Sequence, residues 1–72
     1  MKLPHMSGVE LCKVLCHIGY RIERQRGSHI ILEKNGFPML SIPNHHELDI
    51  GTLKSILRKA GVSTENFLTL IR

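Results

Sequence analysis

The sequence predicts an α+β fold with the element order α-β-β-β-α, followed by a short C-terminal helix. Apolar residues recur at helical spacing in two segments, residues 8–18 and 50–60. Between these segments, apolar and polar residues alternate as in half-buried strands, and glycines mark the turns. Because each helix has one apolar stripe, we expect both helices on one face of a three-stranded antiparallel sheet, with the other face open.

The first helix is expected from Gly8 to Ile18. Ser7 and Glu10 have the S-x-x-E spacing of a capping box, which satisfies free backbone N–H groups at a helix start. Gly19 supplies the left-handed residue that commonly ends a helix. The apolar stripe of this helix consists of Leu11, Val14, Leu15 and Ile18.

The first strand is expected from Tyr20, and Arg26-Gly27 after it predicts a turn. Simple alternation assigns the side chains of this strand to two faces. One face carries Tyr20 and Ile22, and the other carries Arg21, Glu23 and Gln25.

The second and third strands are expected at residues 28–34 and 37–42. Asn35-Gly36 between them predicts a type I′ hairpin turn, which needs positive φ at both central residues. Leu40 and Ile42 are expected on the core face of the third strand. In the second strand, Ile30 and Leu32 are expected to face the helices, with His29, Ile31 and Glu33 on the opposite face.

A loop and two helices are expected after the strands. Pro43 ends the third strand, and the loop reaches Leu48. Asp49 can cap the second helix and Gly61 closes it. Ser63 caps the short last helix, whose apolar contacts come from Phe67, Leu68 and Ile71. The apolar stripe of the second helix consists of Ile50, Leu53, Ile56, Leu57 and Ala60, and the cations off that stripe are Lys54, Arg58 and Lys59.

Length and composition limit the function. A chain of 72 residues is expected to form one domain, residues 1–72, and buries only about 60% of its unfolded surface, so a surface site is expected rather than a deep cavity. The formal net charge of +4 favours a polyanionic partner, although charge alone also serves solubility. We expect a cytoplasmic protein without a membrane partner, because no segment resembles a signal sequence or a membrane span. Cys12 and Cys16 have neither metal-site nor disulfide-framework spacing.

His29 is the strongest candidate for chemistry. Known hydrolase, phosphate-loop and dinucleotide-binding motifs are absent from the sequence. An imidazole can exchange a proton at neutral pH, and RNA carries its own nucleophile in the 2′-hydroxyl, so one histidine beside cations can support cleavage without a metal. The pattern alone, however, favours the simpler explanation that His29 is an exposed polar residue on a strand.

Other candidates are basic residues and loop histidines. His45 and His46 follow Pro43 and can contact phosphate, assist as a second acid, or be solvated. A zinc site that combines them with His29 or the cysteines would lack the usual paired spacing, so we expect no metal. A stripe for a nucleic-acid backbone is expected from Arg21, Arg24, Arg26, Lys54, Arg58 and Lys59, which are otherwise ordinary solvated cations.

Three motifs in this order resemble the HicA family, also called YcfA-like. They are Arg26-Gly27-Ser28-His29, Pro43-Asn44-His45, and the run from Gly51 to Gly61, G-T-L-K-S-I-L-R-K-A-G. The resemblance extends from Ser7 to Phe67. It implies a fold similar to the double-stranded-RNA-binding domain, and a toxin of a type II toxin–antitoxin system that acts as a ribosome-independent mRNA endonuclease. It also implies that the catalytic histidine is His29, and that a HicB antitoxin covers the active site.

Together, the residues and the resemblance predict a metal-independent endoribonuclease that needs no cofactor. His29 is expected to act as general base or acid, with Gly27 allowing close approach of the RNA and Ser28 orienting the imidazole or binding phosphate. The partners are expected to be mRNA and a HicB-type antitoxin, with the toxin either monomeric or assembled in the complex. The residues expected to bind RNA are Arg24, Arg26, Gly27, Ser28, His45, Lys54 and Arg58.

Three other functions are also compatible with the sequence. The same fold can bind structured RNA without cutting it, through shape, 2′-hydroxyls and phosphates. It can also be a protein-interaction domain whose basic face meets an acidic partner, or a nuclease that depends on a metal. Loss of cleavage in His29→Ala would argue against a binding module without nuclease activity. RNA affinity that falls with salt would argue against a protein-interaction domain, and activity in a chelator would argue against a metal-dependent nuclease.

Overall fold

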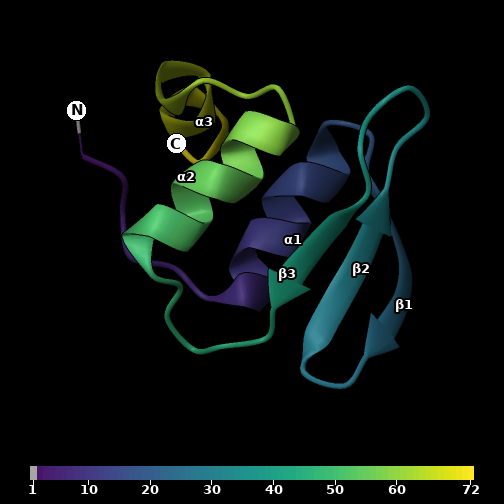
Figure 1. Cartoon of the computed structure of the whole chain (residues 1–72). Coiled ribbons are helices and arrows are strands. Elements are labelled where there is room, and N and C mark those ends of the chain that lie inside the picture. Colours follow the sequence, from purple (N-terminus) through teal and green to yellow (C-terminus); the bar gives the residue numbers. More distant parts are fainter. Residues whose placement is uncertain (1) are drawn as a thin grey trace.

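A computed structural model describes residues 2–72 and confirms the predicted α+β fold with a three-stranded antiparallel sheet (Figure 1). The sheet order is β1-β2-β3, so β2 is central and β1 and β3 are edge strands. No helix within the described residues is long and apolar enough to cross a membrane. The elements are α1 (Gly8–His17), β1 (Arg21–Arg26), β2 (His29–Glu33), β3 (Leu40–Pro43), α2 (Ile50–Lys59) and α3 (Thr64–Leu70).

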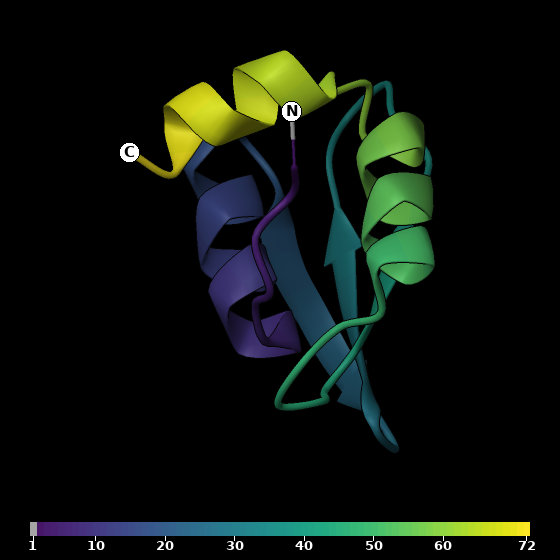
Figure 2. The same ribbon diagram turned by 90° about the vertical axis from the view of Figure 1, so that its left-hand side faces the viewer.

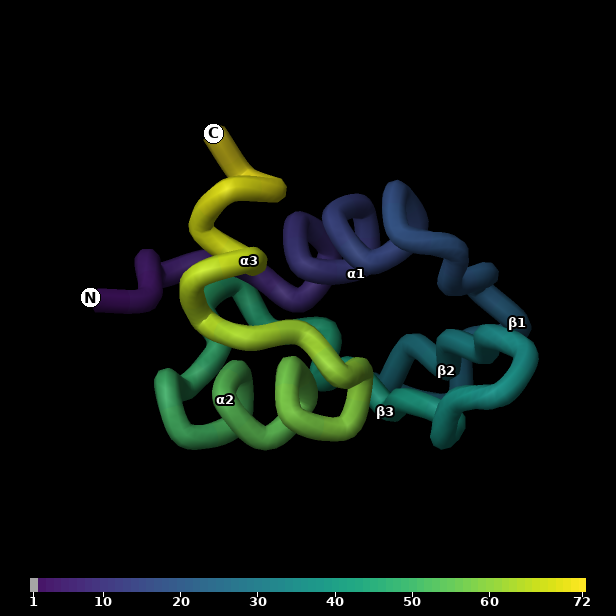
Figure 3. The backbone as a smooth tube through the Cα atoms, turned by 90° about the horizontal axis from the view of Figure 1, so that it is seen from above, coloured from purple at the N-terminus to yellow at the C-terminus, as the bar shows by residue number. Residues whose placement is uncertain are grey.

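Both long helices lie on the same side of the sheet, and α3 crosses over one end of the pair (Figures 2 and 3). The side chains between these layers form the core, and each buried aliphatic side chain contributes about 1.5–3 kcal/mol to stability. Within residues 2–72, no helix lies on the opposite face of the sheet. Residues central to this core are Leu11, Leu15, Leu32, Leu40, Ile42, Leu53, Leu57 and Phe67.

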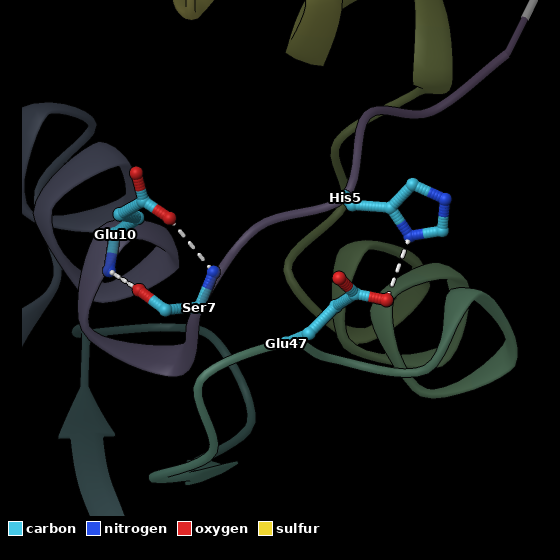
Figure 4. Close-up of polar contacts among 4 residues, drawn as sticks. All are labelled: His5, Ser7, Glu10 and Glu47. Atoms are coloured by element: carbon cyan, nitrogen blue, oxygen red, sulfur yellow. Dashed lines mark hydrogen bonds and ion pairs between the residues drawn. The ribbon is translucent and has the colours of Figure 1, made fainter.

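The helix starts follow the sequence predictions closely. At α1, the Glu10 N–H donates to Ser7 Oγ at 3.0 Å and the Ser7 N–H donates to Glu10 Oε1 at 2.8 Å, which completes the capping box (Figure 4). At α3, the Asn66 N–H donates to Ser63 Oγ at 3.1 Å. Asp49 occupies the cap position of α2, but its side chain makes no capping hydrogen bond. The Asp49 carboxylate is therefore not used in holding that helix.

The connection between β2 and β3 differs from the prediction. The Phe37 N–H donates to the Lys34 carbonyl at 3.1 Å, and only Gly36 has positive φ, which is the pattern of a type II turn rather than the predicted type I′ turn. The strand pairing begins farther away, with Leu32 opposite Leu40. A two-residue hairpin would have shifted this register by one residue and turned the apolar residues of β3 away from the helices. The longer loop is therefore favoured because it allows Leu40 and Ile42 to be buried in the core.

The first strand contains a β-bulge that the sequence pattern did not predict. The register shifts between Ile22 and Arg24, which leaves Glu23 as the extra residue. Before the bulge, Ile22 lies opposite Leu32 of the core, and after it Gln25 lies opposite Ile30. The assignment of Gln25 to the same face as Arg21 was therefore wrong, because unbroken alternation does not survive an inserted residue.

The loop after β3 is tied to three other parts of the chain: the β1–β2 turn, the start of α1 and the N-terminal segment. The Asn44 N–H donates to the Ser28 carbonyl at 2.7 Å, and the Gly8 N–H donates to the His45 carbonyl at 3.0 Å. Glu47 pairs with His5 of the N-terminal segment at 3.2 Å (Figure 4). These bonds hold the loop between the β1–β2 turn and the start of α1.

Gly8 should be intolerant of a side chain, because a Cβ there would overlap the backbone carbonyl of Pro43. We predict that Gly8→Ala lowers the free energy of unfolding by about 2 kcal/mol, as expected for forced overpacking against backbone. Urea denaturation measures this change. The control is Gly51→Ala in α2, whose nearest neighbour is the movable Asp49 carboxylate at 3.2 Å, and which should be neutral or stabilising. Equal stability of both variants would contradict the close approach at Gly8.

Candidate functional site

His29 begins β2 directly after a two-residue turn. Arg26 pairs with His29 across this turn, and Gly27 has a φ of +61° at its first position, as in a type II′ hairpin. Ile30, the next residue, belongs to the core, so alternation places His29 on the open face of the sheet. The His29 side chain is exposed, as predicted, and the ring makes no hydrogen bond to any residue from 2 to 72.

A shallow pocket adjoins this histidine on the open face. Its volume is about 280 Å³, and it is lined by Arg26, His29, Ile31, Met39 and Ser41. Ile31 is only 4% exposed although it lies outside the core beneath the helices, so neighbouring side chains on the open face cover it. The pocket therefore combines an apolar floor with an imidazole and a guanidinium. This composition suits a ribose or base edge with an adjoining phosphate.

The three arginines of β1 share the face of His29. Arg26 lies opposite His29, Arg24 opposite Ile31 and Arg21 opposite Glu33. Cross-strand partners project from the same face of a sheet. The bulge at Glu23 makes this possible, because residues 21, 24 and 26 cannot all face one side of a regular strand.

These arginines are available to an external anion. The only ion pair found among residues 2–72 joins His5 to Glu47, so none of the three arginines is neutralised by a salt bridge in that part of the chain. All of β1 is exposed. The open face therefore carries a row of unpaired positive charge next to an imidazole, which attracts a phosphodiester backbone.

His45 lies at the end of the sheet that carries His29. Pro43 pairs with His29. The hydrogen bonds from Asn44 to Ser28 and from Gly8 to the His45 carbonyl then fix the backbone of the loop as far as His45. His45 and His46 are both exposed. Within residues 2–72, no three His, Cys, Asp or Glu side chains are grouped so that they could hold a metal ion.

The cations of α2 separate into two surfaces. Lys54 and Arg58 line a hollow shared with the start of α3. Lys59 lines a different groove, between α2 and β3, together with Met39 and Ser41 of the His29 pocket. The structure thus brings Lys59, rather than Lys54 or Arg58, to the residues around His29. The sequence pattern could not separate them, since all three lie off the apolar stripe.

An apolar groove between α1 and β1 was not expected from the sequence. It has a volume of about 510 Å³, and both Cys12 and Cys16 line it together with the exposed side chains of Val9 and Ile22. The only sequence signal was an apolar residue, Ile22, on an otherwise polar strand. Because the groove lies on the helical side of the sheet, it is separate from the His29 pocket.

Comparison with known proteins found one family. A family model described as the HicA toxin of bacterial toxin–antitoxin systems matches residues 8–62. No curated protein matches the chain. The matched region includes α1, the whole sheet and α2, and therefore all residues of the His29 pocket.

The two cysteines within this matched region provide a test of how α1 packs. Burial raises the pKa of the Cys12 thiol to about 11, and Cys12 is 2% exposed whereas Cys16 is exposed. We predict that iodoacetamide at pH 8 modifies Cys16 and spares Cys12 in the folded protein, and modifies both in urea, as peptide mass spectrometry would record.

The same burial predicts a pH dependence of stability. The folded pKa of Cys12 lies above its ordinary value of 9.0, so the unfolded chain loses this proton first and stability falls as pH rises from 9 to 11. In the iodoacetamide experiment, equal modification of Cys12 and Cys16 in the folded protein would contradict the burial of Cys12.

Proposed function

Because the chain belongs to the family of HicA toxins of bacterial toxin–antitoxin systems, we propose that it is a metal-independent endoribonuclease that cuts mRNA with His29 as its catalytic residue. The observation that carries this proposal is the exposed imidazole of His29 beside arginines that no carboxylate neutralises within residues 2–72. A toxin that cleaves mRNA needs a proton-transfer group and cations at one open surface, and this surface has both.

The reaction uses the 2′-hydroxyl of the RNA as nucleophile. His29 removes the 2′-hydroxyl proton, and the 2′-oxygen forms a bond to phosphorus. The bond from phosphorus to the 5′-oxygen then breaks, and the 5′-oxygen takes a proton from the imidazolium or from water. The products are a 2′,3′-cyclic phosphate and a 5′-hydroxyl. A single imidazole suffices because the substrate supplies its own nucleophile.

The arginines stabilise the charge that develops in the transition state. Negative charge on the phosphate oxygens increases when the 2′-oxygen adds, and positioned cations lower the energy of that state. Arg26 is the direct cross-strand partner of His29, and Arg24 lies one pair further along the same face. A guanidinium can bind two phosphate oxygens at once, which suits this role.

The turn and the loop hold the RNA near His29. Gly27 has open space around the position of a Cβ, so the RNA can approach its backbone closely. Ser28 binds phosphate through its hydroxyl, since its carbonyl already accepts the Asn44 N–H. His45 contacts the strand from the adjoining loop. Lys54 and Arg58 act only on RNA that extends past the pocket, because they lie toward α3.

The family implies an antitoxin partner, and we propose that it is a HicB-type protein that covers the open face of the sheet. Covering this face would block His29 and neutralise the arginines of β1 at the same time. The toxin is then either free and active or held in the complex, and its site of action is the cytoplasm, where mRNA lies.

One observation favours a second candidate, an RNA-binding module without nuclease activity. Apart from His29, no residue that lines the pocket can exchange a proton near neutral pH: Arg26, Ile31, Met39 and Ser41 complete the lining. Such a module would bind RNA through the same arginines and would not depend on the imidazole. Dependence of cleavage on His29 separates the two candidates.

We predict that His29→Ala reduces RNA cleavage at least about a hundredfold, because general acid–base catalysis contributes at least that much. RNA binding, measured by fluorescence anisotropy, should stay within about threefold, since the arginines remain. The matched control is His17→Ala, an exposed histidine at the end of α1. Undiminished cleavage by His29→Ala would refute the catalytic role.

A second prediction concerns the substrate. Replacing the ribose at the cut site with 2′-deoxyribose should abolish cleavage there, because the nucleophile is missing, and gel electrophoresis would show uncut RNA. Mass spectrometry of the normal products should show a cyclic phosphate. Activity should persist in EDTA. Cleavage of the deoxy substrate at the same position, or loss of activity in EDTA, would rule out this mechanism.

A further inference from the structure

The β3–α2 groove has properties that the proposed cleavage site does not use. Its volume is about 550 Å³, and it lies on the outer side of the edge strand β3. Because β3 pairs only with β2, part of its backbone donors and acceptors point outward into this groove. The β3 backbone can therefore supply hydrogen bonds on the side of the sheet, among the side chains of Met39, Leu40 and Pro43.

The groove continues directly from the His29 pocket. Met39 and Ser41 line both depressions. Pro43 of β3, which also lines the groove, is the cross-strand partner of His29 in β2. The short strand β3 is thus the ridge between the two depressions. A flexible chain bound at His29 can pass over Ser41 and enter the groove without leaving the surface.

The groups on the α2 side are those that bind a sugar–phosphate backbone. Thr52, Ser55 and Lys59 line the groove at helical spacing and therefore share one face of α2. Hydroxyl and ammonium groups are among the side-chain groups that contact phosphate and sugar in nucleic-acid complexes. Lys59 is exposed and has no carboxylate partner among residues 2–72, so its charge is free for a phosphate.

One carboxylate also lines the groove, at the opposite end from Lys59. Asp49 precedes α2 and Lys59 is its last residue, so the rise of the helix separates them by about 15 Å. The phosphate must therefore lie toward Lys59 and Met39. Asp49 can accept a hydrogen bond from a ribose hydroxyl or a base amino group, since it makes no capping bond.

From these contacts we infer that the groove between β3 and α2 binds the ribose–phosphate backbone next to the cleavage site, with Lys59 as its phosphate-binding cation. This inference rests on the proposed nuclease function and adds a second contact region to it. The RNA bends around the β3 edge, from the open face to the helical side. A double helix has a persistence length of about 500 Å, so a sharp turn around one edge of a molecule of 32 × 27 × 18 Å is costly for it, and we expect a single strand in the groove.

The test compares charge removal at two lysines in a His29→Ala background, which binds RNA without cutting it. For a single-stranded oligoribonucleotide, Lys59→Ala should weaken binding about fivefold and reduce the slope of log affinity against log salt by about 0.7. Lys59→Arg should restore most of the affinity. Lys13→Ala on α1, which loses the same charge away from the groove, should bind like the parent. Circular dichroism confirms folding of each variant.

A second measurement uses the active protein and substrates of two lengths. Cleavage of a dinucleotide, which fills only the His29 pocket, should be unchanged by Lys59→Ala, whereas the KM for a longer single strand should rise about fivefold with kcat unchanged. Equal effects of Lys59→Ala and Lys13→Ala, in a protein that cleaves RNA through His29, would overturn the groove and leave the nuclease proposal standing. Absence of RNA binding in the parent protein would overturn both.

Discussion

The two-sidedness of the sheet is the constraint on which the site depends. Side chains along a strand alternate between faces, and one face here must be apolar to pack against α1 and α2. In β1, regular alternation from the turn would have placed Glu23 toward the helices and Ile22 on the open side. The bulge at Glu23 corrects both, and it also turns Arg21 to the same face as Arg24 and Arg26. The orientation of Ile22 toward the helical side and the alignment of three cations on the open face thus have one cause.

Much of this arrangement is readable in the sequence, because its signals are local. The capping box of Ser7 and Glu10 depends on residues three apart. Alternation within a short strand places the side chains of His29 and Ile30 on different faces of the sheet. The bulge in β1 and the register of β3 are not local, since each depends on how the strand pairs with β2. A one-residue change in either reverses a whole face.

The cations of α2 show the same limit at the site itself. Spacing along a helix gives the direction of a side chain around the helix axis but not the element it meets there. Lys54, Arg58 and Lys59 are alike in sequence, and only the packing of α2 between β3 and α3 separates them. The α1 groove was missed for a related reason: the sequence does not show that Ile22 stays exposed between β1 and α1.

The exposed edge of β1 has a consequence for the solution behaviour of the protein. A long, unpaired strand at a sheet margin is a template on which another copy can add its own strand, and this leads to aggregates. Here each such approach would bring two rows of guanidinium groups together, and their repulsion opposes it. A partner that supplied acidic side chains would meet no such barrier. The charge along this margin therefore disfavours pairing with a like copy and favours a chain of opposite charge.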